Sequence, residues 1–179
     1  KYEAISAPTK TKQLPDGSDF RQVNPLGYVP YLVLDDGTGV SEGPAIVQYI
    51  ADQAPATQLA PPAGTLARYQ LQEWLGFINS EIHKGFGPLL NPATPADYRT
   101  IAIKNLTHRL NYLADHLATH DYLLGERFTV ADGYLFTVLG WGQWVGIDLK
   151  EWPALAAFQE RIGARPSVRD ALAAEAASN

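Results

Sequence analysis

The sequence predicts a protein in two parts, a small α/β part that ends near residue 54 and an all-helical part that begins near residue 65. Up to residue 54, short β-branched and aromatic runs alternate with turn signals such as Asp-Asp-Gly. Beyond residue 65, apolar residues recur at helical spacing almost throughout. The proline-rich stretch 55–64 between them is typical of a linker, so we assign residues 1–54 and 65–179 to separate domains.

Composition and charge exclude several classes of protein. Hydrophobic residues make up 46% and charged residues 18%, as in folded globular proteins rather than disordered ones. The 14 Lys and Arg against 19 Asp and Glu give a net charge of −5 at pH 7, and no basic cluster indicates a nucleic-acid surface. The apolar runs fall short of the roughly 20 residues that a membrane span needs. Because the chain has no Cys, it holds neither a disulfide nor a thiolate metal site, and we expect no metal.

The α/β part is expected to contain strands at residues 2–7 and 27–34, a hairpin turn at 35–38, an edge strand at 39–41 and a helix at 42–52. Pro44 falls in the first turn of that helix, where its missing N–H costs no hydrogen bond. The chain begins without Met, and this much sheet is too small to be stable alone. We therefore expect one further strand and one helix upstream of Lys1.

The all-helical part is expected to contain helices at residues 66–86, 96–120, 129–145, 153–162 and 167–177. The third begins with Thr129-Val130-Ala131-Asp132, a capping-box pattern in which the first and fourth residues satisfy each other's backbone N–H groups. Phe128, just before it, suits the hydrophobic staple that accompanies such a start. We interpret this element as structural, and we expect the very apolar helix that follows to be buried on most sides.

A series of ordered motifs runs through both parts of the chain. They are Asn24-Pro25-x-Gly27-x-Val29-Pro30-x-Leu32, Asp35-Asp36-Gly37, Ser41-Glu42-Gly43-x-Ala45-Ile46, Glu73-Trp74-Leu75, Ile82-His83-Lys84-Gly85-Phe86 and Phe128-Thr129-Val130-Ala131-Asp132. In their order and spacing they resemble the cytosolic glutathione transferases, and the His-Lys-Gly-Phe segment is similar to the bacterial beta class. The resemblance covers essentially all 179 residues. It implies a thioredoxin-like N-terminal domain, whose first βα unit lies upstream of Lys1, followed by the family's all-helical domain.

The resemblance also implies how the first domain binds glutathione. Val29-Pro30 corresponds to the family's cis peptide, which turns the Val29 backbone outward to pair with the cysteinyl backbone of glutathione. Glu42 and Gly43 lie where the last strand becomes a helix, so free N–H groups there suit the γ-glutamyl carboxylate, and Glu42 suits the α-ammonium. Lys12 matches a beta-class position that approaches the glycine carboxylate.

His83 is the catalytic candidate and a further glutathione-binding residue. Along a helix it shares a small, polar line with Asn79, Gly76 and Gln72, beside an apolar stripe, as in the wall of a groove. The resemblance places it close to the glutathione sulfur. A neutral imidazole there can take the thiol proton or hydrogen-bond the thiolate, which is the effective nucleophile.

Four further residues are assigned by the resemblance alone. Ser80 and Glu81 correspond to the segment that borders glutathione from the second subunit. Phe86 and Trp141 correspond to the electrophile pocket, and Trp141 matches a tryptophan found in beta-class members. Gly76 stands where the family commonly has an Asn that reaches glutathione across the dimer, so the resemblance leaves that contact open.

The resemblance implies a cytoplasmic, homodimeric detoxification enzyme of bacterial type that conjugates its co-substrate, glutathione, to small hydrophobic electrophiles. Two alternatives stay open. One is a glutathione-dependent disulfide or peroxide reductase, which requires a reactive Cys upstream of Lys1; the other is a non-catalytic transferase-like regulatory or binding module. The presence of Glu42, Val29-Pro30 and His83 favours a working site. The thiol-proximal residue upstream of Lys1 (Cys, Ser or Tyr) and the physiological electrophile are left open.

Overall fold

The computed structural model of the protein describes residues 2–8 and 10–177. Its helices are α1 (Gly43–Gln53), α2 (Leu66–Phe77), α3 (Lys84–Leu90), α4 (Ala96–Leu117), α5 (Val130–Leu139), α6 (Gly142–Val145), α7 (Pro153–Gly163) and α8 (Pro166–Ala177). Its strands are β1 (Leu32–Val33) and β2 (Gly39–Val40). Short 3₁₀ turns occupy Phe20–Gln22, Pro55–Thr57 and Leu149–Glu151, and a π-helical segment, Ile78–His83, joins α2 to α3.

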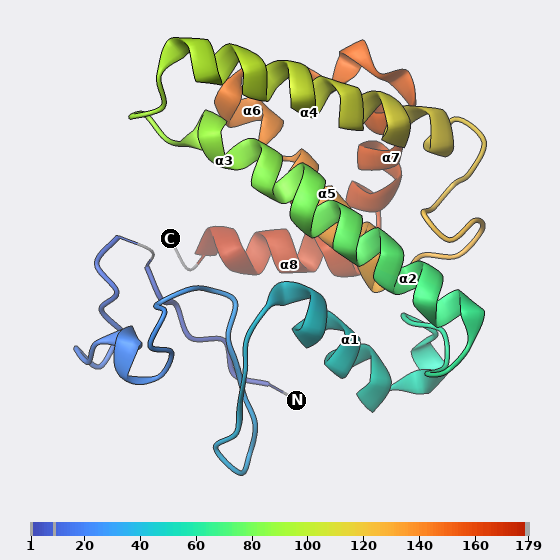
Figure 1. Ribbon diagram of the computed structural model, residues 1–179. Helices are drawn as coiled ribbons and strands as arrows, with labels where there is room; N and C mark the ends of the chain where they lie inside the picture. Colours follow the sequence, from blue (N-terminus) through green and yellow to red (C-terminus); the bar gives the residue numbers. More distant parts are fainter. Residues whose placement is uncertain (1, 9, 178–179) are drawn as a thin grey trace.

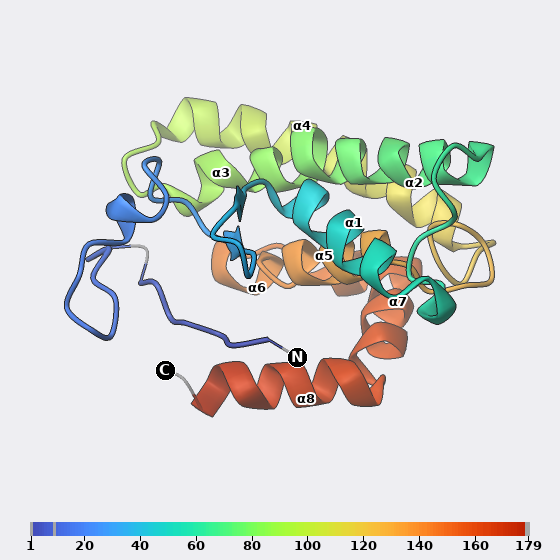
Figure 2. The ribbon, with the colours of Figure 1, turned by 90° about the horizontal axis from the view of Figure 1, so that it is seen from below.

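The helices pack in layers, with the N-terminal part against one end of them (Figure 1). Seen from below, α2, α3 and α4 lie on one side, α5 in the middle and α8 on the opposite side (Figure 2). Helix α4 packs against α3 and α7, and α1 packs against both α2 and α5. Because α1 is the element of the N-terminal part that reaches both of these helices, its N-terminal end is held close to the helical part.

The hydrophobic core lies among these helices, and α4 shows how the sequence builds it. Its buried residues recur every three or four positions and so form one stripe along the helix. They are Ala102, Leu106, Leu110, Leu113 and Leu117. Helix α5 is more deeply enclosed, as its apolar composition predicts, and its buried residues are Ala131, Asp132, Leu135, Val138 and Leu139.

The hairpin of the N-terminal part has the predicted turn. Leu32 pairs with Val40 and Val33 with Gly39 in antiparallel register. Within the turn the Thr38 N–H donates to Asp36 Oδ1 at 2.8 Å, and Gly37 adopts a φ of +84°, which glycine tolerates best. The strands are shorter than the predicted runs 27–34 and 39–41, because only the residues beside the turn find ladder partners.

The strand predicted at residues 2–7 is wrong. These residues are extended but belong to no strand, because no neighbouring segment within the described residues pairs with their backbone. A β-strand is defined by hydrogen bonds to a neighbour, so an alternating pattern alone does not produce one.

Two predicted helices are interrupted. The helix expected at 66–86 extends to Leu90 but changes to π-helical geometry between α2 and α3. The helix expected at 129–145 divides into α5 and α6 at Gly140. Gly142, the first residue of α6, lets the chain fold back after this short helix, because a Cβ there would lie 2.8 Å from the Ile147 carbonyl oxygen. Within residues 2–8 and 10–177, no helix is both long and apolar enough to cross a bilayer.

Candidate functional site

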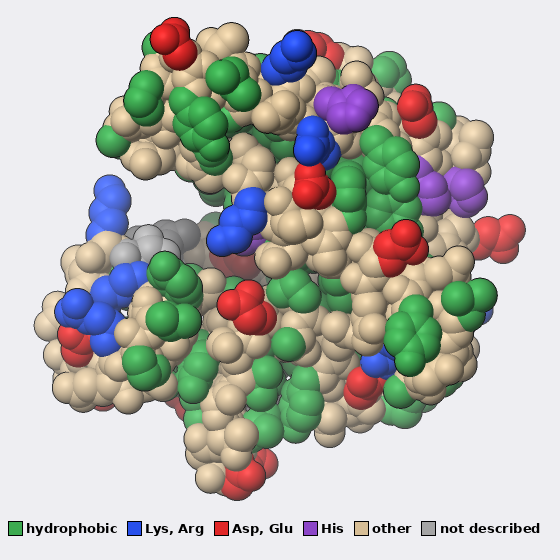
Figure 3. Space-filling view, in the orientation of Figure 1, with side chains coloured by type: hydrophobic (Ala, Val, Ile, Leu, Met, Phe, Trp, Pro, Cys, Tyr) green, Lys and Arg blue, Asp and Glu red, His purple; other side chains and the backbone are tan. Residues whose placement is uncertain are grey.

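A cavity of about 930 Å³ lies between the N-terminal part and the helices. Figure 3 shows the molecular surface hollowed there, with charged side chains at the rim. Seven of the predicted site residues line this cavity: Lys12, Val29, Pro30, Glu42, Gly43, His83 and Trp141. They come from five separate stretches of the chain, so the fold brings together residues that are far apart in the sequence.

The cis peptide expected at Val29-Pro30 is present, and Val29 is 47% exposed beside the cavity. Asn24, which is buried, holds the loop before it. The Asn24 amide donates to the Tyr28 carbonyl oxygen at 2.8 Å, and its Oδ1 accepts from the Leu26 N–H at 3.3 Å. The Val29 backbone is therefore presented at the cavity by a braced loop.

Glu42 occupies the N-cap of α1 in an unusual backbone conformation. Its φ of 68° and ψ of 112° lie in a region that residues with a side chain rarely adopt, at a cost of about 1–3 kcal/mol. The Glu42 side chain makes no capping hydrogen bond to α1, Pro44 has no N–H, and the Ala45 and Ile46 N–H groups donate to the Glu42 carbonyl oxygen. This end of α1 therefore offers the Gly43 N–H and the Glu42 carboxylate at the cavity. One donor beside one acceptor suits a zwitterionic ligand group.

Lys12 reaches the cavity from the loop that precedes the first 3₁₀ turn. Its Nζ donates to the Gly27 carbonyl oxygen at 2.5 Å, and its own backbone has a φ of 57°. The ammonium is therefore held beside the Val29 loop, at the N-terminal wall of the cavity.

His83 lies at the end of the π-helical segment, on the opposite wall. Its Nδ1 is 2.7 Å from the hydroxyl oxygen of Tyr134 on α5, and that hydroxyl donates to Asn79 Oδ1 at 3.1 Å. The His83 ring also meets the Trp141 ring edge-to-face, with centroids 4.6 Å apart. Insertion of a π-helical turn is frequent at functional sites, because the extra residue redirects side chains.

Burial, with smaller effects from nearby charges, shifts the pKa values of both His83 and Tyr134. Burial lowers the pKa of His83, the nearby Lys84 ammonium lowers it further, and the Glu42 carboxylate opposes them. Burial, with a contribution from Glu42, raises the pKa of Tyr134 to about 12. At neutral pH, His83 is therefore a neutral imidazole and Tyr134 a hydroxyl group.

Three predicted site residues lie outside the cavity lining. Phe86 is fully buried behind Trp141, with ring centroids 6.0 Å apart. Ser80 is exposed, and the Glu81 carboxylate accepts from Arg109 Nε at 2.8 Å. Sequence reasoning missed Tyr134, because a tyrosine in a mostly apolar helix is usually a core residue. Among the described residues, no group of His, Asp and Glu is arranged to hold a metal ion.

Residues 2–53 match the glutathione S-transferase N-terminal domain, and residues 77–166 match the glutathione S-transferase C-terminal domain. The chain is 44% identical to the glutathione S-transferase GstA of Escherichia coli O157:H7 over 97% of its own length and 87% of that protein's. The chain belongs to the glutathione S-transferase family. The family, the thioredoxin-like N-terminal domain and the helical C-terminal domain inferred from the motifs are thus confirmed.

Solved structures agree with this assignment. The bacterial glutathione S-transferase BphK, in a ternary complex, superposes with a TM-score of 0.96 at 50% identity, over 98% of this chain and 88% of that one. A beta-class glutathione S-transferase from Sphingomonas chungbukensis superposes with a TM-score of 0.93 at 43% identity, over 98% and 87%. The predicted similarity to the bacterial beta class is confirmed.

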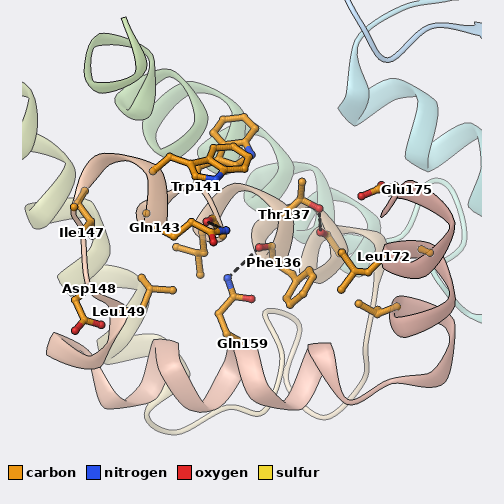
Figure 4. A pocket seen from close by; sticks show the side chains of 18 of the residues that line it. Phe136, Thr137, Trp141, Gln143, Ile147, Asp148, Leu149, Gln159, Leu172 and Glu175 are labelled. Atoms are coloured by element: carbon orange, nitrogen blue, oxygen red, sulfur yellow. Dashed lines mark hydrogen bonds between the residues drawn. The ribbon is translucent and has the colours of Figure 1, made fainter. Parts of the chain in front are cut away.

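A second cavity of about 900 Å³ lies on the other side of α5 in this glutathione S-transferase, between α5, α6 and α8. Its lining includes Ile147, Leu149 and Leu172, and Gln159 Nε2 donates to the Phe136 carbonyl oxygen across it at 3.0 Å (Figure 4). It shares part of one wall, including Trp141, with the first cavity, but it contains none of the residues predicted to bind glutathione. The first cavity is therefore the candidate site.

Proposed function

We propose that this glutathione S-transferase binds glutathione in the cavity between its two parts and conjugates its thiolate to small hydrophobic electrophiles. The observation that supports this most directly is the convergence of three features on one cavity. These are the Val29 backbone beside a cis proline, the N-terminal end of α1 with Glu42, and the neutral imidazole of His83.

Each end of glutathione has a complementary group in this proposal. The γ-glutamyl carboxylate lies at the Gly43 N–H at the start of α1, and Glu42 accepts from the α-ammonium. The Val29 backbone pairs with the cysteinyl residue, as an added strand pairs with a sheet edge. Lys12 binds the glycine carboxylate, exchanging its bond to the Gly27 carbonyl for a charge-assisted one.

The cysteinyl sulfur then lies near His83. The thiol proton passes to the imidazole, and the resulting thiolate attacks the electrophilic carbon. One S–C bond forms, and the leaving group departs with the electrons of the bond that breaks. Trp141 offers an aromatic wall for the electrophile beside the reacting sulfur, with Phe86 supporting it from behind.

We further propose that the enzyme is a homodimer, cytoplasmic and active in detoxification. The aromatic face, which we define as Trp74, Phe77, Tyr112 and His116 on α2 and α4, supports a dimer. Its rings contact one another at centroid distances of 4.7–6.0 Å, and Tyr112 is 54% exposed. Trp74, Phe77 and His116 are half-buried, so the face is partly exposed, and exposed apolar surface of this kind supports an interaction site. Ser80 and Glu81 would then border glutathione bound by the partner subunit.

The proposed domain division is residues 1–54 and 65–179, with the linker at 55–64. The linker is tied to the helical part by an arginine, and the same arginine joins the helical part to α1. Arg68 on α2 donates through Nε to the Pro61 carbonyl oxygen at 2.7 Å and forms an ion pair with Asp52 on α1. This arrangement supports two domains with a fixed relative position.

Retention of the full-length protein on immobilised glutathione and turnover of 1-chloro-2,4-dinitrobenzene test the proposed function. His83→Ala should lower the turnover rate by about one to two orders of magnitude, at the lower end of the effect of proton-transfer groups. His108→Ala, an exposed histidine on α4, is the matched control and should leave the rate unchanged. A full-length protein that neither binds glutathione nor turns over such an electrophile would refute the proposal.

A further inference from the structure

The hydrogen-bond chain behind His83 determines which of its ring nitrogens carries the proton. A neutral imidazole has one N–H donor and one bare acceptor nitrogen, and the partner of one nitrogen decides the state of the other. His83 meets its partner through Nδ1, while its ring lines the cavity. Tyr134 and Asn79, which lie behind the imidazole, therefore determine whether Nε2 carries a proton.

We propose that Tyr134 and Asn79 are positioning residues that keep the His83 proton on Nδ1 and leave Nε2 as a bare acceptor for the thiol proton. This inference rests on the proposed function, since a base is needed only where a thiol is bound. It names a role that the sequence did not reveal, because Tyr134 belongs to a different helix and lies 51 residues away in the chain.

The direction of the two hydrogen bonds, from His83 to Tyr134 and from Tyr134 to Asn79, follows from counting protons. Asn79 Oδ1 can only accept, so the single Tyr134 hydroxyl proton is directed to it at 3.1 Å. The Tyr134 oxygen then presents a lone pair to His83, 2.7 Å away. Nδ1 must be the N–H donor to that lone pair. Because the neutral ring has one N–H group, Nε2 is left bare.

The structure holds all three members in place. Asn79 and His83 lie four residues apart in the π-helical segment, where the Lys84 N–H donates to the Asn79 carbonyl in the π-helical pattern. Tyr134 lies in the first turns of α5, just after the capping box. The Trp141 ring meets the imidazole edge-to-face and restricts its rotation. The pKa of Tyr134, raised to about 12, keeps its proton available for the bond to Asn79.

This arrangement has a direct chemical consequence. In the opposite tautomer Nε2 would carry a proton and could hydrogen-bond a thiol sulfur but not remove its proton. With Nε2 bare, the thiol proton moves to His83 and gives an imidazolium that remains hydrogen-bonded to Tyr134 through Nδ1. The charged groups that act on this ring from neighbouring segments are Glu42, across the cavity, and Lys84 beside it, with opposite effects on its pKa.

The test is the tautomer of His83, read from long-range proton–nitrogen correlation spectra of the ¹⁵N-labelled full chain at about pH 8, where the ring is neutral. The signals are assigned by their loss in His83→Gln. The wild-type protein should show a protonated Nδ1 and a bare Nε2. Tyr134→Phe and Asn79→Leu should shift the proton toward Nε2. Asn79→Asp, which keeps an acceptor for the tyrosine, should retain the wild-type pattern.

The control is Tyr98→Phe, an exposed tyrosine on α4 that should leave the His83 signals unchanged. If Tyr134→Phe does not fold, the two Asn79 variants carry the test alone. A protonated Nε2 in the wild-type protein would overturn the inference. An unchanged His83 tautomer in every folded variant that removes a hydrogen-bonding partner, Tyr134→Phe or Asn79→Leu, would also overturn it.

Activity provides a second readout. Tyr134→Phe should lower kcat/KM for conjugation about tenfold while the KM for glutathione changes little, because the loss falls on proton transfer. The two proposals fail in different ways. If the wild-type protein shows the expected tautomer but conjugates no electrophile, the proposed function is wrong and the tautomer assignment holds. If it conjugates but has Nε2 protonated, the proposed function holds and this inference is wrong.

Discussion

Asp132 offers the sharpest test of how the helical domain is held together. The side chain is fully buried, and its two oxygens accept three hydrogen bonds. Oδ1 accepts from the Leu123 N–H at 2.8 Å, and Oδ2 accepts from the Thr129 N–H at 2.7 Å and from the Thr129 hydroxyl at 2.9 Å. Burial raises the pKa of this carboxyl, and the three donors act against that effect. Asp132→Asn keeps the size of the side chain but replaces one acceptor oxygen by an NH₂ donor.

The expected loss follows from the geometry of the two oxygens. In either orientation of the new amide, its NH₂ group faces a backbone N–H, of Leu123 or of Thr129, and that donor loses its partner. A buried donor left without a partner costs about 1–3 kcal/mol, and the lost bond was to a charged acceptor, which is worth about 1.5–3 kcal/mol. Both ranges include the loss of the same hydrogen bond, so they are not added in full. We expect a decrease of about 2–4 kcal/mol in the free energy of unfolding. For a chain of this length, that lowers Tm by about 5–15 °C.

Urea denaturation followed by circular dichroism measures this change, and an m-value equal to that of the wild type shows that the same transition is compared. Asp148→Asn is the matched control. Asp148 caps an exposed 3₁₀ turn by accepting from the Lys150 N–H at 3.0 Å, and Asn caps equally well, so its effect should stay within about 0.5 kcal/mol. A loss below about 1 kcal/mol for Asp132→Asn, at unchanged m, would refute the reasoning.

Three further predictions concern the cavity and the aromatic face. Lys84→Gln should raise the pKa of His83 and Glu42→Gln should lower it, as followed by NMR titration of the His83 ring protons, because the two charges act in these opposite directions. Since the pKa of His83 is lowered in the folded protein, the neutral ring contributes stability above its unfolded pKa, and that stability is lost as the pH falls through the folded value. A pKa that moves in neither variant contradicts this electrostatic account. Trp141→Ala should raise KM for an aromatic electrophile about tenfold and change KM for glutathione much less, as measured by steady-state kinetics. Equal effects on the two KM values would show that Trp141 does not form the wall that contacts the electrophile. Tyr112→Glu should convert the proposed dimer to a monomer in sedimentation velocity at micromolar concentration, and an unchanged sedimentation coefficient would exclude the aromatic face as the dimer contact.

The elements that the sequence predicted correctly are those with local causes. The hairpin turn at Asp36 and Gly37 is fixed by a side-chain bond two residues along and a positive φ, both readable from residue types. The capping box at Thr129 and Asp132 is equally local. The strand expected at residues 2–7 failed because pairing depends on a neighbouring segment, which an alternating pattern does not reveal.

The site was predicted only in part, because some of its contacts also depend on packing between segments that are distant in the sequence. The family resemblance identified seven residues that line one cavity, but helical periodicity alone could not show the π-helical turn that redirects His83. Nor could it identify Tyr134 as the partner of His83, because that contact joins two helices through packing. Phe86 and Trp141 looked alike in the sequence, and packing placed one in the core and the other on the cavity wall.

The start of α5 connects the stability of the fold to the chemistry of the site. Its first residue, Val130, donates its N–H to the Leu59 carbonyl oxygen in the linker at 2.9 Å, and the capping box fixes the helix from the next turn. Tyr134 follows Asp132 by two residues, so the same anchors that hold the helix end also position the hydroxyl group against His83. A change at Asp132 should therefore act on both properties. The Asp132→Asn variant should loosen the bond between Tyr134 and His83, even at temperatures where the variant stays folded, and this would appear as a mixture of His83 tautomers.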